Sequence, residues 1–367
     1  MPFSWRTLLL GVVTWITLSA QEPVKLPDGD GKKLVVRICA GCHSLETAID
    51  ETRTESGWRV VVGAMAGRGA KGTDIEFNTV VKYLARNFGR SGPAVTKSAV
   101  AAEAAPGKSG KTITSLRIDP KNDWPTFGRT SGVAGYSPLA QISTKNVAKL
   151  KLAWQYGIDS RIASLPGPQR LIPPTEAVPI VIGNVLFTPT AAHSVVALEA
   201  DTGLEIWRYD LGKAAAPLRG VTFWPGDGRY PAEIFAGTSD GRLIALNAVT
   251  GIPVPGFGDE GTINLRTGVA DKYPDKPYHM SSPGVIFRHL IITGSQGQED
   301  NPDGPAQDVR AWDVTTGKLV WTFHPLPNPG EFGYETWPKD AWSRVGSPAN
   351  WGFISICLLY TSDAADE

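Results

Sequence analysis

Residues 196–207 read Val-Ala-Leu-Glu-Ala-Asp-Thr-Gly-Leu-Glu-Ile-Trp, and this stretch decides the fold. Related copies follow at residues 244–251, Ile-Ala-Leu-Asn-Ala-Val-Thr-Gly, and at residues 310–321, Arg-Ala-Trp-Asp-Val-Thr-Thr-Gly-Lys-Leu-Val-Trp. Each copy predicts a strand, a Thr-Gly turn and a second strand, because glycine tolerates the positive φ that such a turn needs. The tryptophan four residues after the glycine can pack between adjacent sheets.

The spacing of the copies indicates the architecture. Gly203, Gly251 and Gly317 lie 48 and 66 residues apart, which corresponds to one four-stranded propeller blade for each copy, with insertions. The middle copy has Pro255 where tryptophan is expected, so we predict that this blade is degenerate. From Asp123 onward, short apolar runs alternate with glycine and proline and no long amphipathic stretch occurs, which predicts an all-β domain.

Composition limits the partners. The chain has 36 Lys and Arg residues against 36 Asp and Glu residues, so its formal net charge is zero. Because the sequence has no basic stripe that would neutralise phosphates, we expect no nucleic acid partner. A length of 367 residues with 42% hydrophobic content is sufficient for two or more domains with ordinary cores.

Residues 1–20 are predicted to be a signal peptide. Their mostly apolar run, residues 7–18, is shorter than a membrane span and is followed by the small residues Ser19 and Ala20. We therefore expect export to the periplasm. An uncleaved N-terminal anchor, which would make the protein membrane-associated, is the alternative, because only Arg6 supplies a cationic side chain ahead of the run.

Residues 24–90 are predicted to form a small all-α domain. Apolar residues recur at helical spacing within residues 33–38 and 77–84. Residues 91–120 are rich in Ala, Ser, Gly and Lys and have few large apolar side chains, so we expect a flexible linker there. The β-rich domain then covers residues 121–353.

The helical domain contains Cys39-Ala-Gly-Cys42-His43, the Cys-x-x-Cys-His signature of covalent haem attachment. Two thiols one helical turn apart can add to the two vinyl groups of the macrocycle, and the next imidazole can ligate the iron. A zinc site would need two further soft ligands, but the other four histidines lie in the β-rich domain. A redox Cys-x-x-Cys motif leaves the adjacent histidine unexplained. The motif therefore predicts haem c, attached at Cys39 and Cys42, with His43 on the iron.

Met65 is predicted to be the second axial ligand of the iron. It is the only methionine of residues 24–90 and lies twenty-two residues after His43. A single methionine is also a common core residue, so a packing role is the alternative. A Met/His ligand pair raises the reduction potential, which suits an electron acceptor.

The start of the β-rich domain resembles that of pyrroloquinoline quinone (PQQ)-dependent dehydrogenases. The resemblance rests on residues 123–129, Asp-Trp-Pro-Thr-Phe-Gly-Arg, on residues 136–139, Tyr-Ser-Pro-Leu, and on residues 150–154, Leu-Lys-Leu-Ala-Trp. It continues over residues 121–353 and is closest to the membrane-type glucose and quinate dehydrogenases. It implies an eight-bladed β-propeller with PQQ and Ca²⁺ at the central axis, of which this region would form about half.

The resemblance also implies which residues contact PQQ. Glu176 resembles the family's acidic contact, and Arg219 resembles the arginine that binds the quinone oxygens. His193 resembles a histidine that glucose-type members place beside the cofactor, although its place directly after a predicted strand also fits a core histidine.

Three further positions match in the same way. Ser281, or its neighbour Ser282, corresponds to a hydroxyl contact, Glu299 to an acidic calcium ligand, and Trp351 to the tryptophan that stacks under the PQQ ring. A planar, polyanionic quinone does require an aromatic floor, a guanidinium fork and a hard cation held by carboxylates. Taken singly, Trp351 could pack between blades, Arg219 could form a surface ion pair and Glu299 could be a solvated loop carboxylate.

Departures from the family pattern limit the prediction. The adjacent cysteines of methanol-type members are absent, which favours the glucose-like branch. The family's catalytic Asp, its cationic partner and the other calcium ligands follow the region that ends near Phe353, so the catalytic base is expected beyond residue 353. Residues 354–367 neither resemble the family nor complete a blade, and we expect an anomalous tail after a C-terminal truncation.

The sequence therefore predicts a periplasmic quinohaemoprotein that oxidises an alcohol, polyol or sugar with PQQ. Its electrons would pass to its own haem c and then to a cytochrome or respiratory oxidase. The alternative is a c-type electron carrier fused to a propeller that only binds a partner or a carbohydrate. Residues that blade geometry does not require, such as Glu176, Arg219 and Trp351, favour the enzyme.

Overall fold

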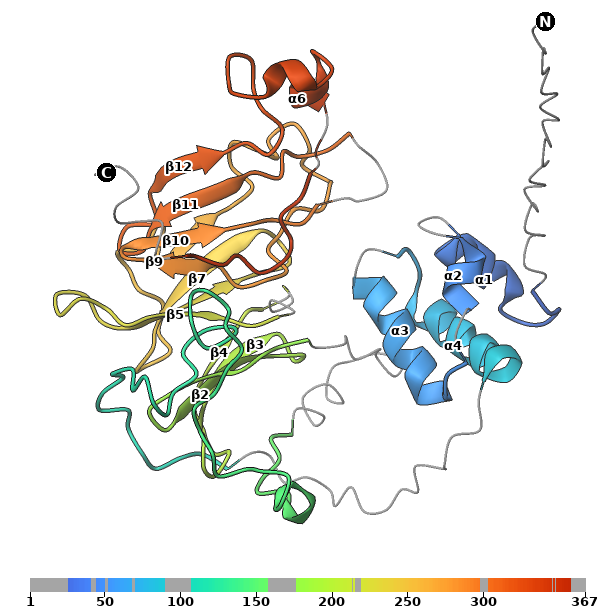
Figure 1. Cartoon of the computed structure of the whole chain (residues 1–367). Coiled ribbons are helices and arrows are strands. Elements are labelled where there is room, and N and C mark those ends of the chain that lie inside the picture. The colour runs from blue at the N-terminus through green and yellow to red at the C-terminus, as the bar shows by residue number, and fades with distance from the viewer. Residues whose placement is uncertain are drawn as a thin grey trace, which may run out of the picture.

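The structure is a computed structural model that describes residues 26–40, 44–49, 52–67, 70–89, 107–157, 176–212, 214, 219–297, 303–344, 346 and 348–357. Helices form the N-terminal part of the described chain, and β-sheets follow from residue 180 onward (Figure 1). The predicted signal peptide, residues 1–20, lies outside the described residues.

Four helices form the N-terminal unit: α1 (Lys32–Cys39), α2 (Leu45–Ile49), α3 (Glu55–Gly67) and α4 (Asp74–Phe88). Their shared core contains Val35 of α1, Trp58 of α3 and Val80 of α4, all buried. A capping box between Thr73 and Glu76 satisfies free backbone amides at the start of α4. Both stretches with helical periodicity, residues 33–38 and 77–84, are therefore confirmed as helical.

The β-rich part consists of three four-stranded antiparallel sheets, each with its strands in chain order. The strands of the first sheet are β1 (Ile180–Ile182), β2 (Val185–Thr190), β3 (Ser194–Glu199) and β4 (Glu205–Asp210). Those of the second are β5 (Thr222–Trp224), β6 (Glu233–Gly237), β7 (Arg242–Asn247) and β8 (Thr262–Asn264). Those of the third are β9 (Val285–Phe287), β10 (Leu290–Thr293), β11 (Val309–Asp313) and β12 (Leu319–Phe323). The repeats thus form propeller blades, as predicted.

The middle repeat is irregular where proline replaces tryptophan. After Gly251 the chain forms an isolated bridge between Leu246 and Pro253, and the regular strand β8 begins at Thr262. Proline cannot donate a ladder hydrogen bond, so the fourth strand of this sheet starts late. The predicted degeneracy of this blade is confirmed.

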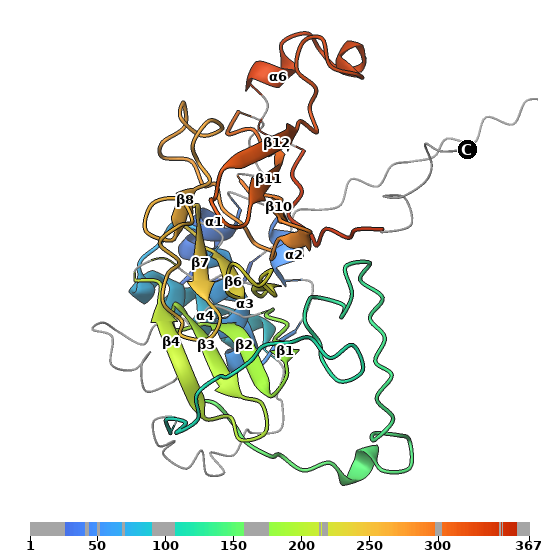
Figure 2. The ribbon, with the colours of Figure 1, turned by 90° about the vertical axis from the view of Figure 1, so that its left-hand side faces the viewer.

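The three sheets follow one another side by side in chain order, as two perpendicular views show (Figures 1 and 2). One buried cluster contains apolar residues of the first and second sheets, and another contains residues of the second and third. Trp207 of β4 is 7% exposed and belongs to the first of these clusters. Trp207 therefore packs between sheets, as predicted, whereas Trp321 of β12 is 38% exposed.

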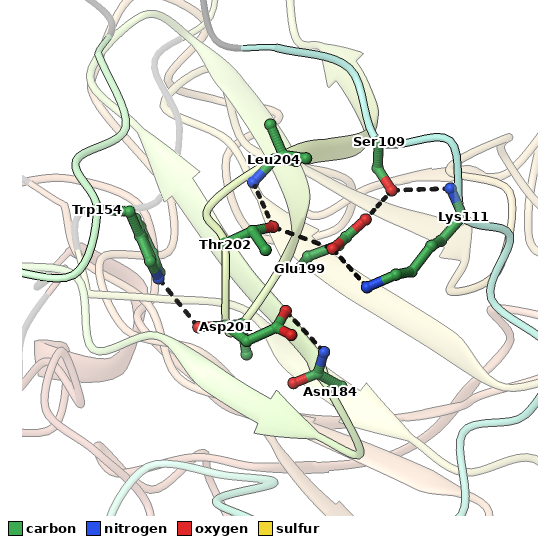
Figure 3. Close-up of polar contacts among 9 residues, drawn as sticks. Ser109, Lys111, Trp154, Asn184, Glu199, Asp201, Thr202 and Leu204 are labelled. Carbon is green, nitrogen blue, oxygen red and sulfur yellow. Dashed lines mark hydrogen bonds and ion pairs between the residues drawn. The ribbon is translucent and has the colours of Figure 1, made fainter.

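Glycine is required where this tryptophan meets the next blade. Gly251 has φ +71°, and a Cβ atom there would lie 2.6 Å from the Trp207 ring. The Trp207 Nε1 donates a hydrogen bond to the carbonyl oxygen of Ala248, at 2.9 Å. Trp154 repeats this arrangement one blade earlier, on Gly203 and with the carbonyl oxygen of Ala200 as acceptor, at 3.1 Å (Figure 3).

Residues 107–120 differ from the expected flexible linker, because they lie against the first sheet. Lys108 forms a parallel bridge with Glu205 of β4, and the Ser109 amide donates to the Glu205 carbonyl oxygen at 2.8 Å. The Glu199 carboxylate accepts hydrogen bonds from the Lys111 ammonium, at 2.8 Å, and from the Ser109 hydroxyl (Figure 3). The edge of β4 has backbone groups without a sheet partner, and this segment, which we call the strap (residues 107–111), pairs with them.

The remaining short helices are η1 (Val147–Lys149), η2 (Tyr334–Thr336) and α6 (Ala341–Arg344). Of the expected anomalous tail, residues 354–357 are described, and the Ile356 amide donates to the Ser131 carbonyl oxygen at 2.8 Å. Within the described part of the chain, every helix is too short or too polar to cross a bilayer.

Candidate cofactor site

Three of the predicted PQQ contact positions lie just ahead of the first strand of a sheet. Glu176 precedes β1, Arg219 precedes β5, and Ser281 and Ser282 precede β9. Two hydrogen bonds join these strand starts: the Val178 amide donates to the Arg219 carbonyl oxygen at 3.2 Å, and the Thr222 hydroxyl donates to the Gly284 carbonyl oxygen at 2.8 Å. Residues more than one hundred positions apart in sequence therefore meet at one end of the three sheets.

Arg219 is the centre of this group. Its Nε donates to the Glu176 carboxylate at 2.9 Å, and its Nη1 donates to the Ser282 hydroxyl at 3.3 Å. The same Nη1 donates to the carbonyl oxygen of Trp351 at 3.1 Å, and the guanidinium carbon lies 4.8 Å from the centroid of the Trp351 ring. One arginine thus contacts an acid, a hydroxyl and an aromatic face.

Backbone contacts fix the position of Trp351. Its carbonyl oxygen also accepts hydrogen bonds from the Ser281 hydroxyl, at 2.9 Å, and from the Ser282 hydroxyl, at 2.7 Å. The side chain remains 47% exposed. Because the main chain is held and the ring is open, Trp351 can offer an aromatic surface to a ligand.

Two glycines allow the backbone segments around Trp351 and Arg219 to pack closely against their neighbours. A Cβ atom on Gly294, directly after β10, would lie 2.0 Å from the Asn350 carbonyl oxygen. Gly220 has φ +139°, a conformation that L side chains rarely adopt, and follows Arg219 directly. A side chain at either glycine would move Trp351 or Arg219 away from the site.

An aromatic pair beside the site was not predicted from the sequence. Phe127 stacks on Phe353, with the two ring planes 6° from parallel. Both rings line a small recess together with Pro283, which follows the Ser281–Ser282 pair. The only sequence signal was the position of Phe127 within the motif at residues 123–129, which marks a family resemblance but gives no contact.

The chemistry of the group suits a planar anion. The Arg219 side chain is 16% exposed and that of Glu176 is 46% exposed, so the ion pair is partly shielded from water. A guanidinium fork binds carboxylate or quinone oxygens with two donors, and serine hydroxyls can accept or donate beside it. Together with the open Trp351 ring, these residues fit PQQ.

His193 does not join this group in the structure. It lies in the turn between β2 and β3 with φ +55°, at the same end of the first sheet as Glu176. Its side chain makes no hydrogen bond to Arg219 or Glu176, and the contact of His193 with PQQ stays a prediction.

The calcium site cannot be built from the described residues. Glu299 lies outside them, between Gly297 and Asp303, where the description resumes. Among the described residues, no three His, Cys, Asp or Glu side chains are grouped so that they could hold a metal ion. The role of Glu299 as a calcium ligand stays a prediction.

The haem motif is only partly described. Cys39 is the last residue of α1 and packs against the helical core, whereas Cys42 and His43 lie outside the described residues. Met65 is half-buried on α3 of the same unit. Haem attachment and axial ligation by Met65 therefore stay predictions.

The three four-stranded sheets form a partial β-propeller, and the group around Arg219 lies at the starts of their first strands. The family described as "PQQ: Glucose/ethanol/alcohol dehydrogenase, beta-propeller domain" matches residues 124–357, and the chain belongs to this family of PQQ-dependent dehydrogenases. The match includes residues 354–357, which the sequence alone had assigned to the tail.

Relatives support the same family. The chain is 33% identical over 240 residues to quinoprotein glucose dehydrogenase A of Acinetobacter calcoaceticus, covering 58% of this chain and 29% of that protein. It is 31% identical over 242 residues to quinohemoprotein alcohol dehydrogenase ADH IIB of Pseudomonas putida, covering 61% of this chain and 30% of the relative. The solved quinohemoprotein alcohol dehydrogenase of Comamonas testosteroni is also similar, with a TM-score of 0.44 and 27% identity over 58% of this chain and 29% of that one. The chain thus spans about three tenths of the length of these proteins.

Proposed function

We propose that this chain is part of a PQQ-dependent dehydrogenase that oxidises an alcohol, a polyol or a sugar and transfers the electrons to a haem c in its own N-terminal unit. The convergence of Glu176, Arg219, Ser282 and Trp351 supports this proposal most directly. These residues come from three blades and a C-terminal segment, and blade packing alone does not require them together.

The residues of this chain would bind and orient the cofactor. The Trp351 ring would form the floor under its plane, and the Arg219 guanidinium would direct donors at its oxygens. Glu176, paired with Arg219 at 2.9 Å, would hold the guanidinium in place and accept a hydrogen bond from the edge of the cofactor. When bound, PQQ supplies the two-electron redox chemistry that no amino-acid side chain provides.

Calcium belongs to the same proposal. Glu299, two residues after Gly297 in the sequence, would supply a carboxylate ligand. The general base that takes the proton of the substrate hydroxyl has no assignment among the residues of this chain.

The N-terminal unit is proposed as the electron acceptor. Cys39 and Cys42 would attach haem c covalently, with His43 and Met65 as axial ligands. The name of the Pseudomonas putida relative, a quinohemoprotein, agrees with haem and PQQ in one protein. We further propose a periplasmic location, with a soluble cytochrome or a respiratory oxidase as the next acceptor.

Cofactor binding and haem reduction test the proposal separately. The protein, expressed with cytochrome c maturation, should show a c-type haem spectrum and should bind PQQ in the presence of Ca²⁺ with quenching of tryptophan fluorescence. Adding glucose, quinate or ethanol to the loaded protein that contains this chain should then reduce the haem. A normal haem spectrum without saturable PQQ binding would point instead to an electron carrier fused to a binding module.

A further inference from the structure

A cavity of about 280 Å³ lies between the loops that follow β8, β10 and β12. In each sheet the second and fourth strands end where the first strand begins, so these loops share an end of the propeller with the cofactor site. The cofactor residues Arg219 and Trp351 are not part of its wall. The cavity is therefore a separate space on the cofactor-facing end.

His324 in the wall of this cavity is held in one orientation. Its Nδ1 lies 2.8 Å from one oxygen of Glu331, and the other oxygen of Glu331 accepts the Asn328 amide at 2.7 Å. This backbone hydrogen bond lowers the pKa of Glu331, so its carboxyl group is ionised at neutral pH. The Asn328 side-chain nitrogen also lies 3.1 Å from Nδ1, so Glu331 and Asn328 together fix the ring, and Nε2 is the ring nitrogen nearer to Asp308.

The Asp308 carboxyl group lies across a gap from Nε2. The His324 Nε2 lies 3.8 Å from Asp308 Oδ2, which is too far for a direct hydrogen bond. Asp308 is 8% exposed, and burial raises its pKa. A hydroxyl group between these two atoms could donate a hydrogen bond to one of them and accept a hydrogen bond from the other, provided that the other atom carries a hydrogen. The pair therefore suits an alcohol group better than an ion.

The rest of the wall adds an aromatic face and amides. Trp342 of α6 lines the cavity and is 43% exposed, and Asn328 and Gln307 contribute amide side chains. The Gln307 side-chain oxygen, Oε1, accepts a hydrogen bond from the Gly297 amide at 2.9 Å, which fixes that part of the wall. An aromatic surface with convergent carboxyl, imidazole and amide groups matches a small ring that carries hydroxyls on its edge and C–H bonds on its faces.

We propose that this cavity is a binding site for a polyhydroxylated ligand of monosaccharide size, with Asp308 and His324 bound to its hydroxyl groups and Trp342 against its C–H face. The site is independent of PQQ, because none of its wall residues belongs to the cofactor group. It would hold a polyol or sugar on the end of the propeller where the cofactor site opens.

Binding to the full chain prepared without PQQ tests this proposal. Saturation-transfer NMR with myo-inositol and with methyl α-D-glucopyranoside should show saturable binding. Asp308→Asn should weaken it about tenfold, and Trp342→Ala should weaken it about three- to tenfold. Trp337→Ala is the matched control, since Trp337 is 41% exposed in the same segment but does not line the cavity.

Two results would overturn the proposal. One is the absence of saturable binding of either polyol to the folded protein. The other is binding that both cavity variants leave unchanged. Lys272 and Arg344 also line the cavity, so inorganic phosphate is titrated in parallel. Binding of phosphate without either polyol would assign the cavity to anions and would exclude the polyol site. Trp342→Ala keeps the test decisive if Asp308→Asn fails to fold, because Trp342 lies on an exposed helix.

Discussion

At the scale of single residues, Arg219 combines roles that a lysine cannot combine. Its Nε contacts Glu176, its Nη1 contacts Ser282 and the Trp351 carbonyl oxygen, and its plane lies near the Trp351 ring. A lysine ammonium is a point charge on a flexible stem and cannot reproduce this fork. The site therefore depends on the shape of the cation as well as on its charge.

Arg219→Lys should weaken PQQ binding by about tenfold or more, because the charge stays but the two-point contact is lost. Fluorescence titration with PQQ and Ca²⁺ measures the effect. Arg229→Lys is the control, since Arg229 contacts Tyr230 and is exposed away from the site. Equal dissociation constants for the Arg219 variant and the parent protein would contradict the assignment of Arg219 to the cofactor.

Met65→Leu should leave haem attachment intact but remove the axial thioether, because attachment depends on Cys39 and Cys42. We expect the absorption band of Met–iron ligation to disappear and the reduction potential to fall. Met280→Leu is the control, since Met280 is 3% exposed in the propeller core. An unchanged spectrum and potential in the Met65 variant would assign Met65 to helix packing instead.

At the scale of elements, a tryptophan packs directly on the next Thr-Gly turn at Gly203 and at Gly251. Gly251→Ala should destabilise the propeller by roughly 3 kcal/mol or more, because Cβ would strike Trp207 and alanine would also adopt a positive φ. Gly212→Ala separates the two causes. Gly212 has the same φ of +71°, and a Cβ atom there would meet no atom of the described residues within 4 Å. Backbone strain alone should therefore cost about 1–2 kcal/mol at Gly212. Urea unfolding measures both, and equal losses would remove the role of Trp207.

Glu233 on β6 is a buried carboxyl group without compensation. It is fully buried, and neither of its oxygens has a hydrogen-bond partner among the described residues. Burial, with a smaller contribution from the nearby Asp313 carboxylate, raises the pKa of Glu233 from 4.5 to about 8. The folded state therefore keeps a proton that the unfolded state has released between these two values.

Stability should consequently fall as pH rises from about 4.5 to about 8 and then level off, because the unfolded state binds fewer protons over that range. Glu233→Gln should remove this slope and raise the melting temperature above pH 7, by about 2–4 °C for each kcal/mol gained. Glu199→Gln should act in the opposite sense and lower stability at neutral pH. Hydrogen bonds from Lys111 and Ser109 lower the pKa of Glu199 to about 2, so its ionised form stabilises the fold. If the melting temperatures of the Glu233 variant and of the parent protein changed equally with pH from pH 4 to 9, this role of Glu233 would be ruled out.

The local repeats made the blades predictable from the sequence. Contacts between residues far apart in the chain could not be predicted in this way. Gly203, Gly251 and Gly317 marked three turns because each turn needs a positive φ, and Pro255 marked the irregular blade. The sequence of the strap predicts a linker, because it is rich in Gly, Lys and Ser and has no large apolar side chain. The partners of its Lys and Ser residues, Glu199 and Glu205, lie about 90 residues away, and no local pattern reveals such a pairing.

In the candidate site, too, the sequence predicted some features and only the structure shows the others. Family resemblance identified its residues in order, but only the meeting of three strand starts shows that Arg219 and Glu176 touch. His193 matched equally well by sequence, yet it lies in the turn between β2 and β3 without a hydrogen bond to that pair. Resemblance gives the identity of a contact residue, while its place depends on strand register.

At the scale of the whole molecule, the strap sets where the helical unit is attached to the propeller. Lys108 pairs with Glu205, the first residue of β4. Because β1 and β4 run in opposite directions, the start of β4 lies at the end of the first sheet opposite to Glu176, which precedes β1. The length of β4, residues 205–210, is about 20 Å, which is the distance from one end of the first sheet to the other. Residues 90–106 could span up to about 60 Å when extended. The chain between the two units is therefore long enough to bring the haem motif to the cofactor end from an anchor on the other end.

Cutting the chain between the units should convert haem reduction from an intramolecular to a bimolecular reaction. A protease site inserted within residues 91–106 leaves the strap and the helices intact, and the same variant before cleavage is its own control. In stopped-flow experiments with PQQ-loaded protein and substrate, the rate of haem reduction should be independent of protein concentration before cleavage, because the tether maintains a millimolar effective concentration. After cleavage, the rate should rise in proportion to concentration and fall well below the uncut value in dilute solution. If the cut protein still reduced its haem at the original, concentration-independent rate, a stable interface between the units would hold them together, and the tether would not be what couples the two cofactors.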